Sequence, residues 1–226
     1  MNRFLKQFIY AFFFFFVICL IFGLFFLFKS KPKEPQLSFK TLDVEWTKFV
    51  NVNGQITILT SLLNPNLDFP AEFDYRIRIY NPYGGMIKEV NKSSFIYAGE
   101  KKYLIESIDI GEQSVGRVNL DIQKTSFLKK KILSPKTEIL FKSTQVIDRN
   151  YFLKGKIRNN ENLPLYHIKL IAFVLENHHL LLASSTYIQK LDANQETLFE
   201  IFFPNVKDIK LLQQPVTIYI EAKYKP

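Results

Sequence analysis

Apolar residues form one uninterrupted stretch near the start of the chain, over residues 8–28, with the sequence FIYAFFFFFVICLIFGLFFLF and no charged side chain. Its 21 residues extend about 30 Å as a helix, at about 1.5 Å of rise per residue, which is the thickness of the hydrocarbon core of a bilayer. A helix also satisfies its backbone hydrogen bonds internally, as a lipid environment requires. The stretch therefore predicts a transmembrane helix over residues 8–28.

A cleavable signal peptide is the competing interpretation of this stretch. Its apolar core would span about 7–15 residues and precede small residues, whereas KSKPK follows here, and Ile18 before Cys19 does not fit a lipoprotein signal. We therefore expect an uncleaved anchor in the cell membrane. A tail of only residues 1–7, and the translocation of long domains largely regardless of charge, favour a cytoplasmic N-terminus and extracytoplasmic C-terminal domains. Similar numbers of basic residues flank both ends, so domains facing the cell interior stay an alternative.

The rest of the chain follows a different pattern. Residues 29–35 are charged and interrupted by two prolines, which predicts a short extended linker. Beyond them, short segments with apolar residues at every second position recur between turn signals, as is typical of antiparallel β-sandwiches. The clearest of these segments are residues 56–60, 73–79, 115–122 and 137–141. Helix is expected here only in short pieces near residues 125–131 or 206–211.

An internal repeat with an offset of 95 residues runs through this β-rich part. Inward-facing positions coincide without a gap, as Leu62 does with Ile157 and Asn64 with Asn159. A shared register is expected of two copies of one fold, because a slip of one residue would turn every core residue outward. We therefore predict two tandem domains, residues 36–145 and 146–226.

Two segments resemble a known family. Residues 61–66 (SLLNPN) and 73–87 (FDYRIRIYNPYGGMI) resemble the late-embryogenesis-abundant type 2, or water-stress, fold, in which an Asn-Pro-Asn turn precedes a strand ending in a tyrosine turn. Residues 155–160 and 168–177 are similar to the bacterial FxLYD variant, although Leu-Glu-Asn stands in place of Leu-Tyr-Asp and the second turn lacks proline. The resemblance implies seven-stranded immunoglobulin-like sandwiches, often attached to membranes and without a known catalytic apparatus. The expected fold is mainly β, with two tandem immunoglobulin-like antiparallel β-sandwiches behind one N-terminal transmembrane α-helix.

The asparagines of this pattern have a structural explanation. An asparagine side chain bonds its own backbone two residues on and tolerates left-handed conformations, while proline presets its dihedral angle. We therefore interpret Asn64, Pro65 and Asn66, and Asn159 in the second half, as residues of rigid turns between strands.

The charge of the chain does not point to nucleic acid. The formal net charge is +9, but residues 1–34 account for +4 of it, which leaves +5 spread over residues 35–226. This is no basic stripe, so we predict no nucleic-acid partner. The densest cluster, Lys129, Lys130 and Lys131, is a candidate contact with anionic lipid or polymer, or the solvated face of a loop.

The residue types needed for catalysis are sparse. The single cysteine, Cys19, lies in the apolar stretch, so no disulfide, cysteine-ligated zinc site or thiol nucleophile is expected in the β domains. The imidazoles are those of His167, His178 and His179, and no GxSxG motif accompanies them. Adjacent histidines in a strand point to opposite faces, and paired carboxylates such as Glu72 and Asp74 ordinarily form a solvated face. We therefore expect no catalytic residue, metal or cofactor.

These observations favour a noncatalytic, membrane-anchored, extracytoplasmic β-sandwich protein, acting as a binding, scaffolding or envelope-associated module. Its expected partners are the bilayer, through residues 8–28, and a protein or envelope polymer, because exposed sheet edges and faces recruit extended partners. The alternative is an extracytoplasmic hydrolase that acts on envelope polymer. A cleft gathering His167 or paired carboxylates would distinguish that alternative.

Overall fold

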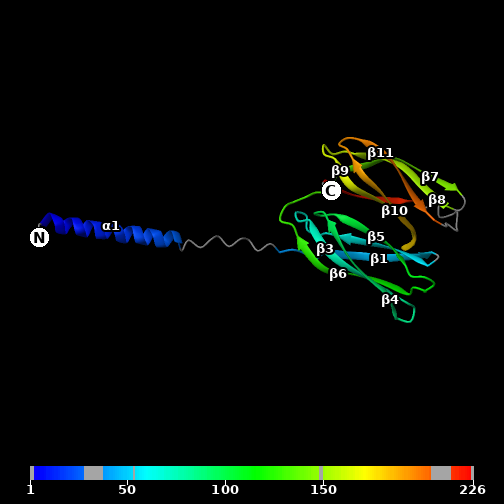
Figure 1. Cartoon of the computed structure of the whole chain (residues 1–226), viewed down its shortest axis with the longest axis horizontal. Helices are drawn as coiled ribbons and strands as arrows, with labels where there is room; N and C mark the ends of the chain where they lie inside the picture. Colours follow the sequence, from blue (N-terminus) through cyan, green and yellow to red (C-terminus); the bar gives the residue numbers. More distant parts are fainter. Residues whose placement is uncertain (1–2, 28–37, 53, 148–149, 205–214, 225–226) are drawn as a thin grey trace. The chain divides into compact units, whose positions relative to one another are not determined.

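The computed structural model describes residues 3–27, 38–52, 54–147, 150–204 and 215–224 (Figure 1). The predicted linker, residues 29–35, and the helical piece expected near residues 206–211 lie outside the described residues. The chain divides into two compact units, Met1–Ser38 and Phe39–Pro226.

The first unit contains helix α1 (Arg3–Leu27), which begins within the tail expected over residues 1–7. Phe28, the last residue of the predicted membrane span, lies outside the described residues. Among the residues that are described, no helix reaches the length and mean hydropathy that mark a membrane-crossing segment.

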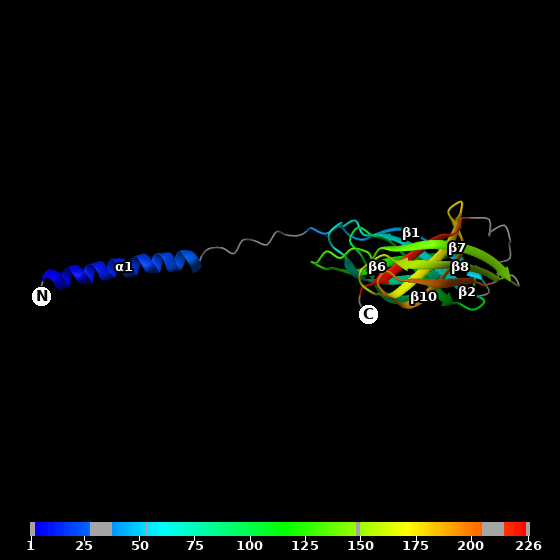
Figure 2. The ribbon, with the colours of Figure 1, turned by 90° about the horizontal axis from the view of Figure 1, so that it is seen from above.

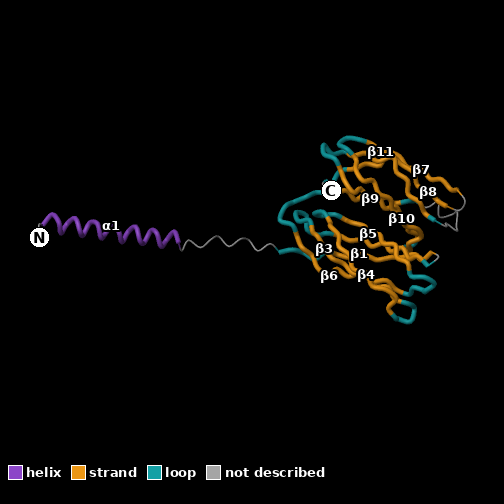
Figure 3. Tube along the Cα trace, viewed as in Figure 1, coloured by secondary structure: helices purple, strands orange, loops and turns teal. Residues whose placement is uncertain are grey.

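The second unit is built almost entirely from strands (Figure 3). Within the described residues they form four antiparallel sheets of three strands each. Sheet A has the order β1 (Asp43–Val52), β2 (Gln55–Leu63), β5 (Lys101–Asp109) and sheet B the order β4 (Met86–Ile96), β3 (Ala71–Tyr80), β6 (Arg117–Phe127). Sheet C has the order β11 (Glu196–Phe203), β8 (Asn150–Asn159), β7 (Thr137–Ile147) and sheet D the order β10 (His179–Leu191), β9 (Leu165–Glu176), β12 (Thr217–Lys223).

Sheets A and B enclose one core, and sheets C and D enclose another. The alternation in β3 illustrates why: Phe73, Tyr75 and Ile77 are buried, whereas Asp74 between them is exposed. Period-two patterns place one face of a strand in the core and leave the other for solvent. The prediction of a mainly β, sandwich-like fold is confirmed. The described residues contain six strands in each half, where the family resemblance implied seven.

The two halves repeat the same architecture. The order β1-β2-β5 returns as β7-β8-β11, and β4-β3-β6 returns as β10-β9-β12. Asn150 at the start of β8 follows Gln55 at the start of β2 by 95 residues, and β11 follows β5 by the same offset, while the other matching strands start 93 to 100 residues apart. The predicted boundary between residues 145 and 146 divides β7, and β7 pairs with β8 along its length, so by strand pairing the second half begins at Thr137.

The helical piece expected near residues 125–131 does not form. Instead, β6 continues to Phe127, which pairs with Ala71 of β3, and the following residues form a loop. The aromatic ring of Phe127 stacks on that of Phe39, with 4.6 Å between the ring centroids. Pairing and aromatic packing therefore outweigh the local helix preference of this segment.

Sheets A and D pack face to face and join the two halves (Figure 1). The contact buries Leu59 and Ile105 of sheet A against Ile171, Phe173 and Leu180 of sheet D. The second unit thus has four layers in the order B, A, D, C, and Figure 2 looks onto their broad faces. The central strands β2 and β9 are buried on both faces as a result.

Candidate functional site

A groove of about 670 Å³ opens where the two halves meet. Strands β3, β4, β5 and β6 supply one wall, and strands β9, β10 and β12 supply the other. Because both halves contribute, the groove exists only while sheets A and D are packed together.

The first wall carries a chain of polar contacts. The hydroxyl of Tyr75 donates to Oε1 of Glu106 at 2.8 Å, and the ammonium of Lys92 forms an ion pair with the same carboxylate. Tyr75 and Lys92 are cross-strand partners, which places both side chains on one face of sheet B. Burial raises the pKa of Tyr75, and the charge of Glu106 raises this pKa further. Tyr75 is therefore a neutral hydrogen-bond donor at physiological pH.

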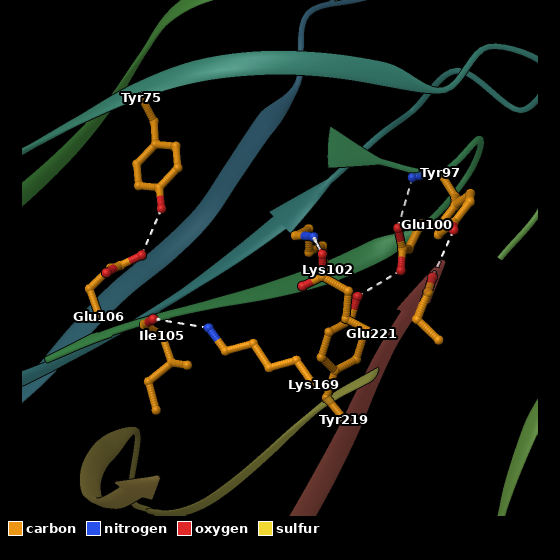
Figure 4. Close-up of polar contacts among 10 residues, drawn as sticks. Tyr75, Tyr97, Glu100, Lys102, Ile105, Glu106, Lys169, Tyr219 and Glu221 are labelled. Atoms are coloured by element: carbon orange, nitrogen blue, oxygen red, sulfur yellow. Dashed lines mark hydrogen bonds and ion pairs between the residues drawn. The ribbon is translucent and has the colours of Figure 1, made fainter. Parts of the chain in front are cut away.

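The second wall is aromatic and basic. Lys169 of β9 donates from Nζ to the carbonyl of Ile105 at 3.5 Å, across the junction of the halves (Figure 4). The same ammonium lies 5.4 Å from the ring centroid of Tyr187, its cross-strand partner. Tyr187 is 65% exposed, and His167 lines the groove with a left-handed backbone, φ 49°. An exposed ring beside a cation suits contact with a ligand.

A buried ion pair lies at the junction, and its carboxylate, that of Glu221, lines the groove. Nζ of Lys102 on β5 is 2.5 Å from Oε1 of Glu221 on β12, and the Lys102 side chain is only 1% exposed (Figure 4). Burial lowers the pKa of Lys102, while the attraction of Glu221 opposes that change. A buried ammonium without its carboxylate would destabilise the folded state. The pair therefore favours the one arrangement of the two halves in which Lys102 and Glu221 meet.

A second polar cluster joins the turn between β4 and β5 to β12. The carboxylate of Glu100 accepts a bond from the hydroxyl of Tyr219 at 2.6 Å and one from the amide of Tyr97 at 2.8 Å. The hydroxyl of Tyr97 in turn donates to the carbonyl of Ala222 at 2.7 Å (Figure 4). Burial raises the pKa of Glu100, against these hydrogen bonds, and raises the pKa of Tyr97 and of Tyr219.

The predicted turn residue Asn64 is buried at the end of β2. Its side-chain amide donates to the carbonyls of Phe69 at 2.8 Å and Tyr97 at 2.9 Å, and its Oδ1 accepts from the amide of Asn66 at 3.0 Å. Asn66 pairs with the backbone of Lys40, donating to its carbonyl at 2.8 Å and accepting from its amide at 2.9 Å. Asn66 thus fixes the chain where it enters the first sandwich.

Asn159 repeats this arrangement 95 residues later. Its side-chain amide donates to the carbonyls of Leu163, Leu191 and Asp192, and its Oδ1 accepts from the amide of Glu161. The positive φ of Gly99 in the first copy recurs at Asn194 in the second, +67° and +58°. Asparagine tolerates that conformation better than most residues, so one turn geometry is kept with different residues.

The remaining candidates lie apart from these networks. Lys129, Lys130 and Lys131 are exposed in the loop after β6, where Lys131 pairs with Asp68 at 2.6 Å. His178 is in the turn between β9 and β10, and its carbonyl accepts a bond from Lys48. Within the described residues, no group of three or more His, Cys, Asp or Glu side chains is arranged to hold a metal ion.

The sequence prediction missed Lys102, Glu100, Glu221 and the groove. One signal for Lys102 was present, because Leu104 and Ile108 mark the inward face of β5 and Lys102 shares their phase. The continuous apolar run in β9, from Leu170 to Leu175, signalled a strand buried on both faces. Neither signal indicates which sheet covers the second face of these strands.

Comparison with known proteins gives no family assignment. No family model and no curated protein matches the chain. Among solved structures, a red sea bream transglutaminase is 12% identical with a TM-score of 0.27, over 83% of this chain and 30% of that one. A β-glucuronidase from glycoside hydrolase family 2 is 10% identical with a TM-score of 0.27, over 87% of this chain and 27% of that one. The chain therefore spans less than a third of either enzyme, and likenesses this weak carry no argument about function.

Proposed function

We propose that the protein is a noncatalytic, membrane-anchored binding module whose groove holds an extracytoplasmic partner, a protein or an envelope polymer. The observation that carries this proposal is the groove of about 670 Å³ with walls from both halves. Its volume lies in the range of ligand-binding clefts. The buried Lys102–Glu221 pair holds those walls in place, and a site fixed before binding loses less entropy when the partner arrives.

The polar groups of the groove favour binding over catalysis. Glu106 already accepts from Tyr75 and pairs with Lys92. Among the described residues, His167 makes no hydrogen bond to a hydroxyl or a carboxylate, whereas a base and the nucleophile it activates lie within about 2.6–3.2 Å of each other.

We further propose that residues 8–28 anchor the chain in the cell membrane, with the N-terminus cytoplasmic and both sandwiches, of the immunoglobulin-like type, outside. The support is the uncharged run of 21 residues, most of which lies in α1. Because the second unit is one compact body, a single anchor would hold both sandwiches at the membrane and raise the effective concentration of the site there.

Site-specific crosslinking in the native membrane tests the groove. A photoreactive amino acid at Tyr187, in the groove, should give an adduct of defined mass. The matched control is the same probe at Tyr83, which is 96% exposed in a turn and does not line the groove. The adduct should disappear when Lys169→Glu is added, because that change reverses the charge beside the Tyr187 ring. Equal adducts from both positions would refute the groove as the binding site.

Two further measurements test the anchor. The full chain should stay in the membrane fraction after alkaline carbonate extraction, and a C-terminal reporter that is active only in the cytoplasm should be silent. Release by carbonate would overturn the anchor, and an active reporter would overturn the orientation.

A hydrolase acting on envelope polymer is the second candidate, because the groove does gather His167 with the carboxylates of Glu106 and Glu221. Turnover of a polymer by the wild type that is lost in both His167→Ala and Glu106→Gln would favour it. Turnover that survives both changes would be unrelated to this groove.

A further inference from the structure

The outer faces of sheets B and C, at the two ends of the stack that the described sheets form, differ in character. Sheet B carries ion pairs on its outer face, Arg78 with Asp121 and Arg76 with Glu89. Sheet C instead exposes Phe141 by 49%, Leu198 by 69% and Phe202 by 43% on strands β7 and β11. Large apolar side chains gathered on one free face mark an interaction surface.

The register of sheet C places its outward residues in rows. Phe152 lies opposite Phe202, Lys154 opposite Glu200, Lys156 opposite Leu198, and Arg158 opposite Glu196, with β8 supplying the first of each pair and β11 the second. The Phe152 and Phe202 rings are 5.2 Å apart at their centroids, and Lys154 Nζ is 3.1 Å from Glu200. Along this face β8 is therefore cationic and β11 acidic, with an aromatic row at one end.

The internal repeat indicates what does not cover this face. Sheet C is the counterpart of sheet A, whose outer face packs on sheet D through Leu59 and Ile105. The residues 95 positions later are Lys154 and Glu200. The patch of sheet D that covers Leu59 and Ile105 is apolar, with Ile171, Phe173 and Leu180. A patch of that kind would remove Lys154 and Glu200 from solvent without offering them a polar partner, so an occupant with charges of its own fits this face better.

We propose that the outer face of sheet C binds the same face of a second copy of this chain, forming a two-fold dimer. The two-fold axis lies between the two faces, parallel to the strands and midway between β8 and β11. Rotation about it places β8 of one copy over β11 of the other and keeps every residue at the same height along the strands, so that each row faces the same row of the second copy. Phe152 then meets Phe202 of the second copy, Lys154 meets Glu200, and Arg158 meets Glu196. Every contact occurs twice, as an isologous interface requires.

The chemistry of the rows supports this pairing. Aromatic residues and arginine are enriched where interfaces are buried, and the Phe152–Phe202 row extends across two copies into a four-ring cluster. Leu198 lies against the aliphatic stem of Lys156 of the second copy, a stem that covers apolar surface while its ammonium stays wet. Sheets packed face to face keep their strands within about 30° of each other, which is compatible with an axis along the strands.

Charge reversal and restoration in the full chain, purified in detergent micelles, tests the dimer by sedimentation. Lys154→Glu should weaken association by at least about tenfold, since like charges then meet across the axis. Lys154→Glu combined with Glu200→Lys should restore it, because the exchanged charges are again complementary. Lys131→Glu, in the exposed loop pair with Asp68, is the matched control and should leave association unchanged. An unchanged circular dichroism spectrum shows that each variant keeps its strands, and unaltered emission from Trp46, the only tryptophan, shows that the A–D junction is intact.

Crosslinking identifies the faces that meet. In a Cys19→Ser background, Leu198→Cys with a short bismaleimide should give a product that stops at two chains, and Asn119→Cys on sheet B should give none. A chain that stays monomeric at all concentrations would overturn the proposal. The proposal would also be overturned if Lys154→Glu left association unchanged, if Asn119→Cys crosslinked as well as Leu198→Cys, or if crosslinking gave products of more than two chains.

Discussion

Lys102 and Glu221 form an ion pair of 2.5 Å between strands that belong to different sandwiches. The two residues are 119 positions apart in the chain, and each lies at the edge of its own sheet. The pair therefore makes a specific arrangement of the halves a requirement of folding, because each charge finds its partner only when sheets A and D are packed.

Removal of one member of this pair should be strongly destabilising. Lys102→Met should lower the free energy of unfolding by about 3–5 kcal/mol, since it leaves Glu221 without its partner at the junction. Adding Glu221→Leu should recover much of that loss, because two apolar side chains replace the buried ion pair. Urea unfolding of the full chain in detergent, followed by Trp46 emission, measures both. If the double variant lost as much free energy of unfolding as Lys102→Met and Glu221→Leu lose together, the two residues would not interact and the pairing would be contradicted.

Glu100 should make the stability depend on pH. Burial raises the pKa of Glu100 above 4.5, so the folded state binds its proton more tightly than the unfolded state does. The resulting contribution to stability is full below about pH 4 and declines as the pH rises through the folded pKa. The free energy of unfolding of the wild type relative to Glu100→Gln should therefore fall as the pH rises above about 4, the ordinary range of a glutamate carboxyl. A difference that stays constant or increases with this rise in pH would contradict the raised pKa.

The two buried asparagines should be equivalent in energy. Asn64→Ala and Asn159→Ala each leave at least two backbone carbonyls without their donor, at a cost of about 2–6 kcal/mol per variant, from about 1–3 kcal/mol for each buried group. Asn160→Ala, an exposed neighbour bonded to Glu138 at 3.3 Å, is the control and should change stability by less than about 0.5 kcal/mol. Thermal unfolding by circular dichroism checks all three, and equal effects from the control and either buried asparagine would refute the assignment.

Sequence reasoning reached the strands of each sandwich because period-two alternation is a local property. It placed Phe73, Tyr75 and Ile77 in a core and detected the offset of 95 residues, and the structure agrees with both. It did not reach the groove, because packing between sheet faces depends on residues far apart in the chain. The exchange of Leu59 and Ile105 for Lys154 and Glu200 at equivalent positions marks the covered face and the free one. The sequence alone does not show that these positions lie on the outer face of a sheet, so the exchange can be interpreted only when the order of the four sheets is known.

The interface between the halves should report its own disruption through Trp46. This side chain lies 5.9 Å from the ring of Tyr103, which in turn lies 4.9 Å from that of Phe173 across the junction. Phe173→Ala should therefore shift Trp46 emission to longer wavelength and lower the free energy of unfolding by about 3–5 kcal/mol, as large cavities in cores do. Phe202→Ala removes the same ring from the free face of sheet C, where Phe202 is 43% exposed, and should leave the emission unchanged. Matching shifts from the two variants would mean that Trp46 does not sense the A–D contact, and the rigid junction on which the groove depends would then lack its support.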